Sequence, residues 1–291
     1  MLFIVHGSMM RQMAPQLLIV AVLSIAAVIT EGRVWQHKVP LNSMPFTLVG
    51  VALALFLGFR NSSAYDRWWE GRKLWGALVN TTRTLTRQAL TMTGDSGDQR
   101  VFINMVIAFV YAMRDQLRGD PFLRSAELLP PALAAEVDRS RYKPFIILRN
   151  MGQWVTDHYN QGRFGEITLT AFDRQLAELS NILGGCERIA ATPVPFAYSV
   201  MIHRVVYFYV ALLPFGLVDS INWMTPAVSI LLAYAFIALD ILAGELEMPF
   251  NRDENDLALD AISLNIELSL REMSGEPLDI PPLKPTRYVL L

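Results

Sequence analysis

Residues able to do chemistry are sparse in this sequence of 291 residues, and the most conspicuous of them lie inside apolar segments. His203, Arg204 and Asp240 interrupt two such segments near the end of the chain. An ionisable side chain that faces lipid is costly, so we expect these residues to face protein, water or the headgroup region. We interpret them as a structural pairing, with Arg188 or Arg204 as conceivable partners of Asp240.

Signatures of catalysis and metal binding do not occur in the sequence. It contains no GxxxxGK[ST], GxGxxG, HExxH or GxSxG pattern, and its four histidines form no ligand-spaced cluster. The single cysteine, Cys186, excludes an internal disulfide framework and any CxxC site. The net charge of −2 provides no basic field of the kind that indicates nucleic-acid binding. We therefore predict neither an enzyme nor a nucleic-acid-binding protein.

The elements that carry these residues are apolar. Hydrophobic residues make up 53% of the chain and charged residues 18%, compared with about 45–50% and about 25% in average soluble domains. Four apolar runs are long enough, or nearly so, to cross a bilayer as helices, at about 13–30, 44–64, 196–218 and 223–243. We expect an all-α integral membrane protein with four transmembrane segments.

Basic residues set the orientation of these segments. They crowd the chain after the second run, at Arg60, Arg67, Arg72, Lys73, Arg83 and Arg87, whereas the loop at 31–43 offers only Arg33 and Lys38. The positive-inside rule places the first of these regions in the cytoplasm. With four spans, both termini are then cytoplasmic as well.

Outside the spans, residues 65–195 and 244–291 are expected to form a large helical cytosolic region. Apolar periodicity predicts helices over 66–93, 101–118 and 166–190, and the prolines of TPVP at 192–195 stop the last of these. Residues 119–144, rich in proline, glycine and charge, are expected to form a surface connection.

The stretch VGVALALFLGFRNSSAYDRWWEGRKLWG (49–76) changes character abruptly, because an uncharged apolar run ends at Phe59 and charge begins at Arg60. Val51, Leu55 and Phe59 have the spacing i, i+4 and i+8, which places them on one stripe of a helix. Taken alone, such a triplet is more often a packing or lipid-facing set than a functional one.

Three segments resemble the bestrophin family, in its bacterial form: PFTLVGVALALFLGFRNSSAYDRWWEGRKLWG (45–76), LGGCERIAATPVPFAY (183–198) and ELEMPFNRDENDL (245–257). The resemblance covers about residues 13–273 and implies that the whole chain, 1–291, is one subunit of a homopentameric ion channel. It implies four transmembrane segments per subunit and a bacterial inner (plasma) membrane location. The expected partners are four further copies of the chain, the lipid bilayer and permeant inorganic ions.

The resemblance also assigns pore positions. Val51, Leu55 and Phe59 match the neck, where five copies would stack three apolar rings that can gate by dewetting. Ile167, in GEITLT, matches the position that narrows the cytosolic end of the pore. A helix that lines such a pore is apolar in the bilayer and charged beyond it, which accounts for the abrupt change after Phe59.

The segment NRDENDL (251–257) resembles the calcium clasp of animal bestrophins. Asp253 and Asp256 match its two side-chain ligands, while Glu245 and Met248 would supply carbonyl oxygens. Arg252 and Asn255 replace acidic residues of that pattern and reduce the negative charge that favours calcium. A solvated acidic loop is the alternative, so we expect no obligatory cofactor, with calcium as a candidate.

Three functions remain open at this stage. A passive channel is favoured, with selectivity for anions such as chloride or for cations such as sodium undecided, since the apolar rings carry no formal charge. The alternatives are a membrane-anchored scaffold or sensory protein whose cytosolic helices bind a partner, and an ion-coupled carrier that uses His203 and Asp240.

Overall fold

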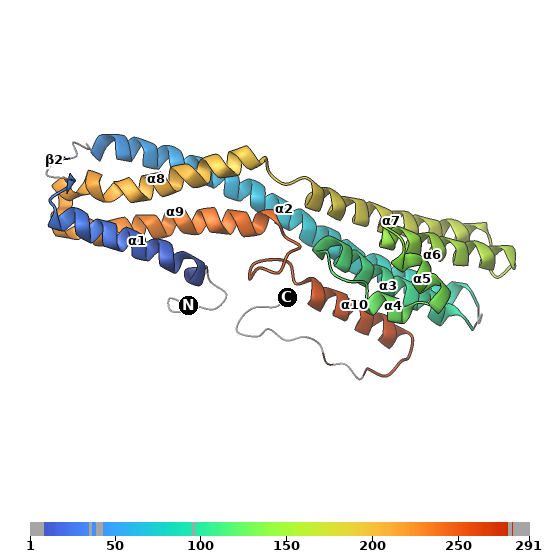
Figure 1. The fold of residues 1–291 in the computed structure, drawn as a ribbon. Coiled ribbons are helices and arrows are strands. Elements are labelled where there is room, and N and C mark those ends of the chain that lie inside the picture. The colour runs from blue at the N-terminus through green and yellow to red at the C-terminus, as the bar shows by residue number, and fades with distance from the viewer. Residues whose placement is uncertain (1–8, 35–36, 39–42, 95–96, 279–280, 282–291) are drawn as a thin grey trace. The chain divides into compact units, whose positions relative to one another are not determined.

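The computed structural model describes residues 9–34, 37–38, 43–94, 97–278 and 281. Most of these residues are helical (Figure 1). The helices are α1 (Met10–Ile29), α2 (Ser43–Met92), α3 (Gln99–Arg118), α4 (Arg124–Leu128), α5 (Pro131–Asp138), α6 (Lys143–Asn160), α7 (Glu166–Ala191), α8 (Phe196–Ile221), α9 (Thr225–Glu247) and α10 (Leu259–Met273). Two strands of two residues each, β1 (Arg33–Val34) and β2 (His37–Lys38), pair in antiparallel fashion. The predicted all-α class is confirmed, apart from this minimal ladder.

Helix α2 is a single element of 50 residues. Its one proline, Pro45, lies in the first turn, where the missing N–H has no intrahelical partner to lose. No later proline interrupts it, and the change from apolar to charged residues at Arg60 does not end it. The prediction of one continuous helix through this change is confirmed.

Prolines follow the end of α7, and an asparagine follows the end of α8. Helix α7 ends at Ala191 and α8 begins at Phe196, so the TPVP segment separates them as predicted. Between α8 and α9, Asn222 has a φ of 44° and opens a short 3-10 turn, Asn222–Met224. Asparagine is one of the few residues that tolerates this left-handed region, so the chain can reverse there.

The segment 119–144 differs from the surface connection that we expected, because it contains two short helices, α4 and α5. Gly119, with a φ of 70°, ends α3 in the left-handed conformation that glycine adopts without strain. Pro131 begins α5, where its fixed φ suits the first helical turn. These glycine and proline residues therefore delimit helices in this segment.

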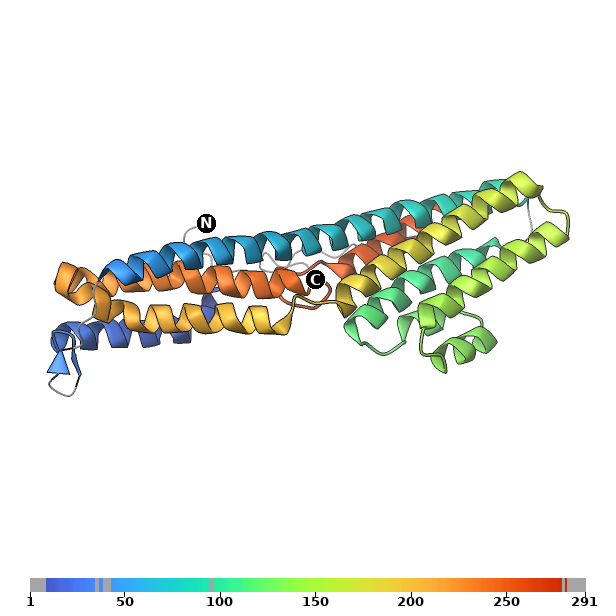
Figure 2. The same cartoon turned by 90° about the horizontal axis from the view of Figure 1, so that it is seen from above.

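The chain divides into two compact units, and α2 contributes its residues up to Trp68 to the first and the remainder to the second. The first unit comprises residues 1–68 and 193–248, and Figures 1 and 2 show α1, α8 and α9 running alongside one another within it. Its apolar core draws on these three helices and on α2, at Met13, Val20, Leu53, Leu57, Ile202, Val206, Tyr209, Val210, Leu213, Ala233, Phe236 and Ile237.

The second unit comprises residues 69–192 and 249–291. Helix α3 is its most buried element, with Phe102 and Phe109 fully enclosed. The buried carboxylate of Glu267 is paired there: the Tyr111 hydroxyl donates to it at 2.7 Å, and Arg271 lies 2.9 Å from it. Such pairing is what makes a buried carboxylate tolerable.

Three helical stretches are long and apolar enough to cross a membrane, among the described residues: 10–29, 44–92 and 196–247. The third contains α8 and α9, which the turn at Asn222 separates. All four apolar runs identified in the sequence are therefore helical.

Candidate functional site

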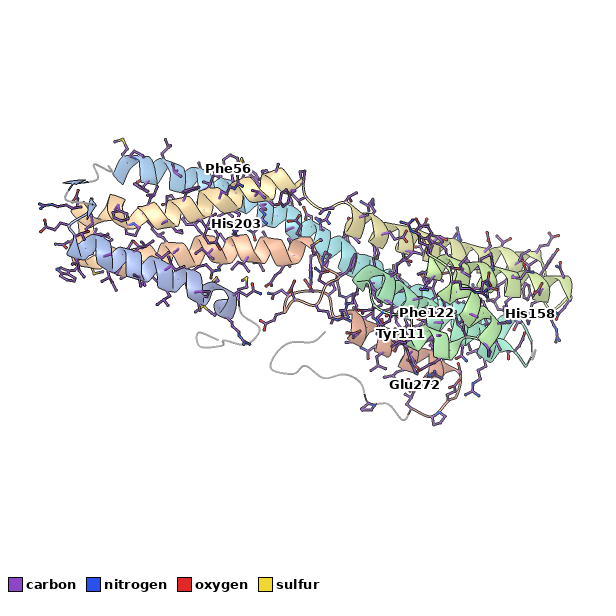
Figure 3. The ribbon with its side chains drawn as sticks, in the orientation of Figure 1. Phe56, Tyr111, Phe122, His158, His203 and Glu272 are labelled. Atoms are coloured by element: carbon purple, nitrogen blue, oxygen red, sulfur yellow. The ribbon has the colours of Figure 1, made fainter. Side chains whose placement is uncertain are left out.

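The three residues assigned to the neck share one exposed side of α2. Val51, Leu55 and Phe59 are 58%, 60% and 67% exposed, whereas Leu53 and Leu57 on another side of the helix are at most 2% exposed. The spacing of four residues keeps the triplet on one stripe, as the sequence indicates. Phe56, labelled in Figure 3, is exposed as well but lies off this stripe. The structure thus brings the three residues together without a covering element among the described residues.

Ion pairing fixes which side of α2 faces inward. Arg60 is 7% exposed, and its guanidinium pairs with the carboxylate of Asp240 on α9. The other terminal nitrogen of Arg60 lies 3.8 Å from Glu247. His203 on α8, labelled in Figure 3, places Nδ1 2.7 Å from the second oxygen of Asp240. One buried carboxylate therefore ties three helices of the first unit together.

Further hydrogen bonds hold α2 along the C-terminal half of α9. The Asn61 amide donates to the Leu239 carbonyl at 3.0 Å, and Arg67 Nε donates to the Glu247 carbonyl at 3.1 Å. The Glu247 carboxylate in turn accepts the N–H of Val194 at 3.0 Å. These contacts set the rotation of α2 about its own axis, and that rotation turns the apolar stripe outward.

The structural pairing expected for His203 and Asp240 is confirmed, but neither of the arginines considered as conceivable partners of Asp240 pairs with it. Arg204 follows His203 on α8 and is exposed. Successive residues of a helix point about 100° apart, so Arg204 does not share the direction of His203. Arg188 belongs to the second unit, where it pairs with Glu70 at 2.5 Å. The true partner is Arg60, which is 180 residues away in the chain, so no local pattern in the sequence pairs the two.

The four residues assigned to a calcium clasp already make local contacts. The Asp253 N–H donates to the Asp256 carboxylate at 2.7 Å, and the Met248 N–H donates to the Glu245 carbonyl at 3.1 Å. The Glu245 carboxylate also accepts from the Gln12 side chain at 3.1 Å. No group of three or more histidine, cysteine or acidic residues with metal-binding geometry occurs among the described residues. Calcium binding stays a prediction.

Arg252, which the sequence suggested would repel calcium, is itself paired. Its two terminal nitrogens lie 3.0 and 2.5 Å from the two carboxylate oxygens of Asp120. The hydrogen bond from Arg252 holds the pKa of Asp120 below its ordinary value. The positive charge beside Asp253 is therefore partly neutralised, which weakens the electrostatic argument against calcium.

Ile167, assigned to the cytosolic aperture, is the second residue of α7 and is 89% exposed. Gly165 precedes the helix in an extended conformation and acts as its N-cap. An aperture residue has to be exposed in the single chain, so the position is compatible with the assignment. The role itself stays a prediction.

Among the other residues whose side chains could do chemistry, Cys186 is buried as expected, and burial raises the pKa of its thiol to about 12. His158 is buried in the second unit, with Nδ1 2.9 Å from the Trp154 carbonyl and Nε2 3.1 Å from Asp98. His6 lies outside the described residues. His158 and His203 occupy different units and serve separate structural contacts.

Comparison with known proteins places this arrangement in a family. The family model described as "Bacterial/Fungal Bestrophin protein" matches residues 1–272. The voltage-dependent anion channel-forming protein RSc3414 of Ralstonia nicotianae is 46% identical, over 95% of this chain and 92% of its own. The voltage-dependent anion channel-forming protein YneE of Escherichia coli K12 is 40% identical, over 100% of this chain and 96% of its own.

A solved structure agrees with the sequence comparison. The crystal structure of a bacterial bestrophin homologue from Klebsiella pneumoniae has a TM-score of 0.87 and 39% identity, covering 90% of this chain and 98% of that one. The fold and its apolar helices define a helical membrane protein. The chain belongs to the bacterial and fungal bestrophins.

Proposed function

We propose that the chain is one subunit of a homopentameric ion channel that conducts passively through a central pore. The observation that carries this proposal is the exposed apolar stripe of Val51, Leu55 and Phe59 in a chain of the bestrophin family. Around a fivefold axis the stripe would form three apolar rings, and a constriction of this kind gates by dewetting because it offers ions no substitute for their hydration. Ile167 would narrow the cytosolic end.

The proposed topology has four spans, formed by α1, the first part of α2, α8 and α9. The basic residues that follow the second span support a cytoplasmic position for that side and, with four spans, for both termini. The proposed location is the inner membrane. The first eight residues and 282–291, which include the termini, lie outside the described part of the chain. The names of the curated relatives support transport of ions and leave the ion selectivity of this chain to be measured.

Reconstitution of the purified protein in a planar bilayer tests the proposal. We expect discrete single-channel current steps. Slow, saturable flux without steps would favour a carrier that uses His203 and Asp240. An incorporated protein without flux would favour a scaffold whose cytosolic helices bind a partner.

We further propose that no cofactor is obligatory and that calcium does not open the channel. Two aspartates and a few carbonyls supply fewer charged oxygen ligands than calcium usually takes in tight sites. Currents should therefore persist in excess chelator, both in the wild type and in a variant with Asp253→Ala and Asp256→Ala. Currents that vanish with chelator, return with micromolar calcium and lose this response in the double variant would contradict the proposal.

A further inference from the structure

The side of α2 that carries the neck stripe continues beyond it. Ser62 and Asp66 follow Phe59 by three and seven residues, and both are exposed. A helix turns about 100° per residue, so Asp66 lies within about 60° of Val51 around the axis. It is displaced from Phe59 by two turns, about 10 Å along the helix. Asp66 is therefore the first charged residue on this side after the neck.

Arg60 and Arg67, the two arginines that flank Asp66 in the chain, face away from this side. Arg60 is buried against Asp240, and Arg67 donates to the Glu247 carbonyl on α9. Both lie about half a turn around the helix from Val51. The charges of Arg60 and Arg67 are thus directed into the first unit and are absent from the stripe.

Asp66 itself is uncompensated. Its carboxylate makes no hydrogen bond or ion pair with any residue in the described ranges, whereas Asp240 on α9 pairs with both Arg60 and His203. Packing therefore sorts the charges of residues 60–67, with Arg60 and Arg67 directed inward and Asp66 outward. The first charge after the neck on the exposed side is thus negative, although the sequence of this segment is rich in arginine.

We propose that Asp66 is a specificity-determining residue of the pore, and that its carboxylates, repeated around the pore, favour inorganic cations over anions. This inference rests on the proposed function, because it requires the stripe to line a central pore. Rings of acidic side chains are a recurrent means of cation selection in channels. The spacing of about 10 Å from Phe59 is close to the Debye length of about 8 Å at physiological ionic strength, so the ring acts on ions as they enter or leave the neck.

Four residues after Asp66 on this side lies Glu70, whose carboxylate pairs with Arg188 at 2.5 Å, and Arg72 follows at the opposite edge of this side, about 60° from Val51. The charged residue nearest the centre of this side is Lys73, a further seven residues along α2 from Asp66. It is displaced from Phe59 by about 20 Å, more than two Debye lengths, so salt screens its effect at the neck far more strongly than that of Asp66. The inference departs from the names of the curated relatives, which describe anion channels. A direct measurement of selectivity therefore separates the two possibilities.

The test measures the ratio of potassium to chloride permeability from reversal potentials in asymmetric KCl across a planar bilayer. We expect a ratio above one for the wild type, a decrease of about tenfold for Asp66→Asn, and retention of the wild-type ratio for Asp66→Glu, since focused fields change local ion concentration by at least this factor. Asp66→Lys should give a ratio below one. The matched control is Asp219→Asn, which removes an exposed aspartate from the last turns of α8 and should leave the ratio unchanged.

Failure of this inference is distinguishable from failure of the proposed function. A conducting wild type whose ratio is below one, or is unaffected by Asp66→Asn, would overturn the role of Asp66 and leave the channel intact. An incorporated wild-type protein without current steps would overturn both.

A second variant covers the case in which the charge substitutions disturb folding. Asp66→Cys introduces one exposed thiol, while the sole native thiol, Cys186, is buried. A cationic methanethiosulfonate reagent added to conducting channels should lower the cation preference, and an anionic one should raise it. If neither reagent changes the permeability ratio, although mass spectrometry verifies that the introduced thiol is modified, Asp66 lies outside the pore.

Discussion

Asp240 shows how a single residue can fix which side of a helix is exposed. Its carboxylate is 4% exposed and is shared by Arg60 from α2 and His203 from α8. Two buried charges are stable only when each is compensated, so the pair holds α2 in one rotation against α9. The direction in which Val51, Leu55 and Phe59 point therefore depends on this pair.

Arg60→Met should therefore destabilise the protein strongly. The substitution leaves the buried carboxylate of Asp240 without its main partner, and breaking a buried pair in this way costs about 3–5 kcal/mol. The measurement is the apparent unfolding temperature of the detergent-solubilised protein.

Arg33→Met provides the matched control, because Arg33 pairs with Glu31 at 3.4 Å with both side chains exposed, and surface pairs contribute about 0–1 kcal/mol. Equal unfolding temperatures for the two variants would mean that the Arg60 pair does not hold the helices.

The ion pair of Asp120 and Arg252 predicts how the stability of the protein depends on pH. The hydrogen bond from Arg252 lowers the pKa of Asp120 in the folded protein below its ordinary value of 3.8. A carboxyl group with a lowered folded pKa binds protons more weakly than in the unfolded chain, so its stabilising contribution is present above the unfolded value and is lost as pH falls through the folded one.

Arg252→Gln should accordingly lower the apparent unfolding temperature at neutral pH, and the difference from the wild type should shrink at pH values below 3.8. Arg139→Gln is the control, since Arg139 is exposed and its guanidinium donates to a backbone carbonyl, that of Ala135, at 2.9 Å. If the difference in unfolding temperature between the wild type and Arg252→Gln stays constant at pH values below 3.8, the pair does not stabilise the protein through the ionisation of Asp120.

At the scale of elements, the sequence predicts best where local rules decide. Proline at 192–195 ends α7 and apolar periodicity predicts α3 and α7, because both signals depend on neighbouring residues alone. The partner of Asp240 was not predictable in this way, since Arg60 is 180 residues away and which helices pack together is a tertiary property. Helices α4 and α5 were missed because glycine and proline at helix ends resemble the composition of a loop.

Helix α2 carries the central prediction about conduction. Replacement of Val51, Leu55 and Phe59 by alanine should widen the neck and remove its apolar barrier, because dewetting requires large apolar side chains at close range. We expect a higher unit conductance or open probability in planar bilayers, with the oligomer intact.

Substitutions at Leu53 and Leu57, on another side of the same helix, would be an unsuitable control for the triple variant, because both are core residues. Phe56→Ala is a better control, since Phe56 is exposed but lies off the stripe, and it should leave conductance near the wild-type value. Currents of the triple variant that match those of the wild type would remove the stripe from the pore.

At the scale of the whole molecule, the first unit leaves much apolar surface uncovered. The apolar window of α2 is less buried within the single chain than those of the other two candidate membrane-spanning stretches. Lipid can cover most exposed side chains of such a unit, but a pore lined by one helix per subunit requires several copies around an axis. The exposed stripe and the proposed pore therefore imply an oligomer with closed rotational symmetry.

The mass of the solubilised particle tests this directly. Light scattering combined with size exclusion, with the bound detergent subtracted, should give about five times the chain mass of 32.8 kDa. The neck variant Val51→Ala, Leu55→Ala, Phe59→Ala should give the same mass, because residues that face a pore contribute little to contacts between subunits. A monomeric or dimeric wild-type particle would exclude a central pore built from α2, since one or two copies of a helix cannot enclose it. A pentamer that dissociates only in the neck variant would place the stripe at the interface between subunits, and its apolar exposure would then serve assembly instead of conduction.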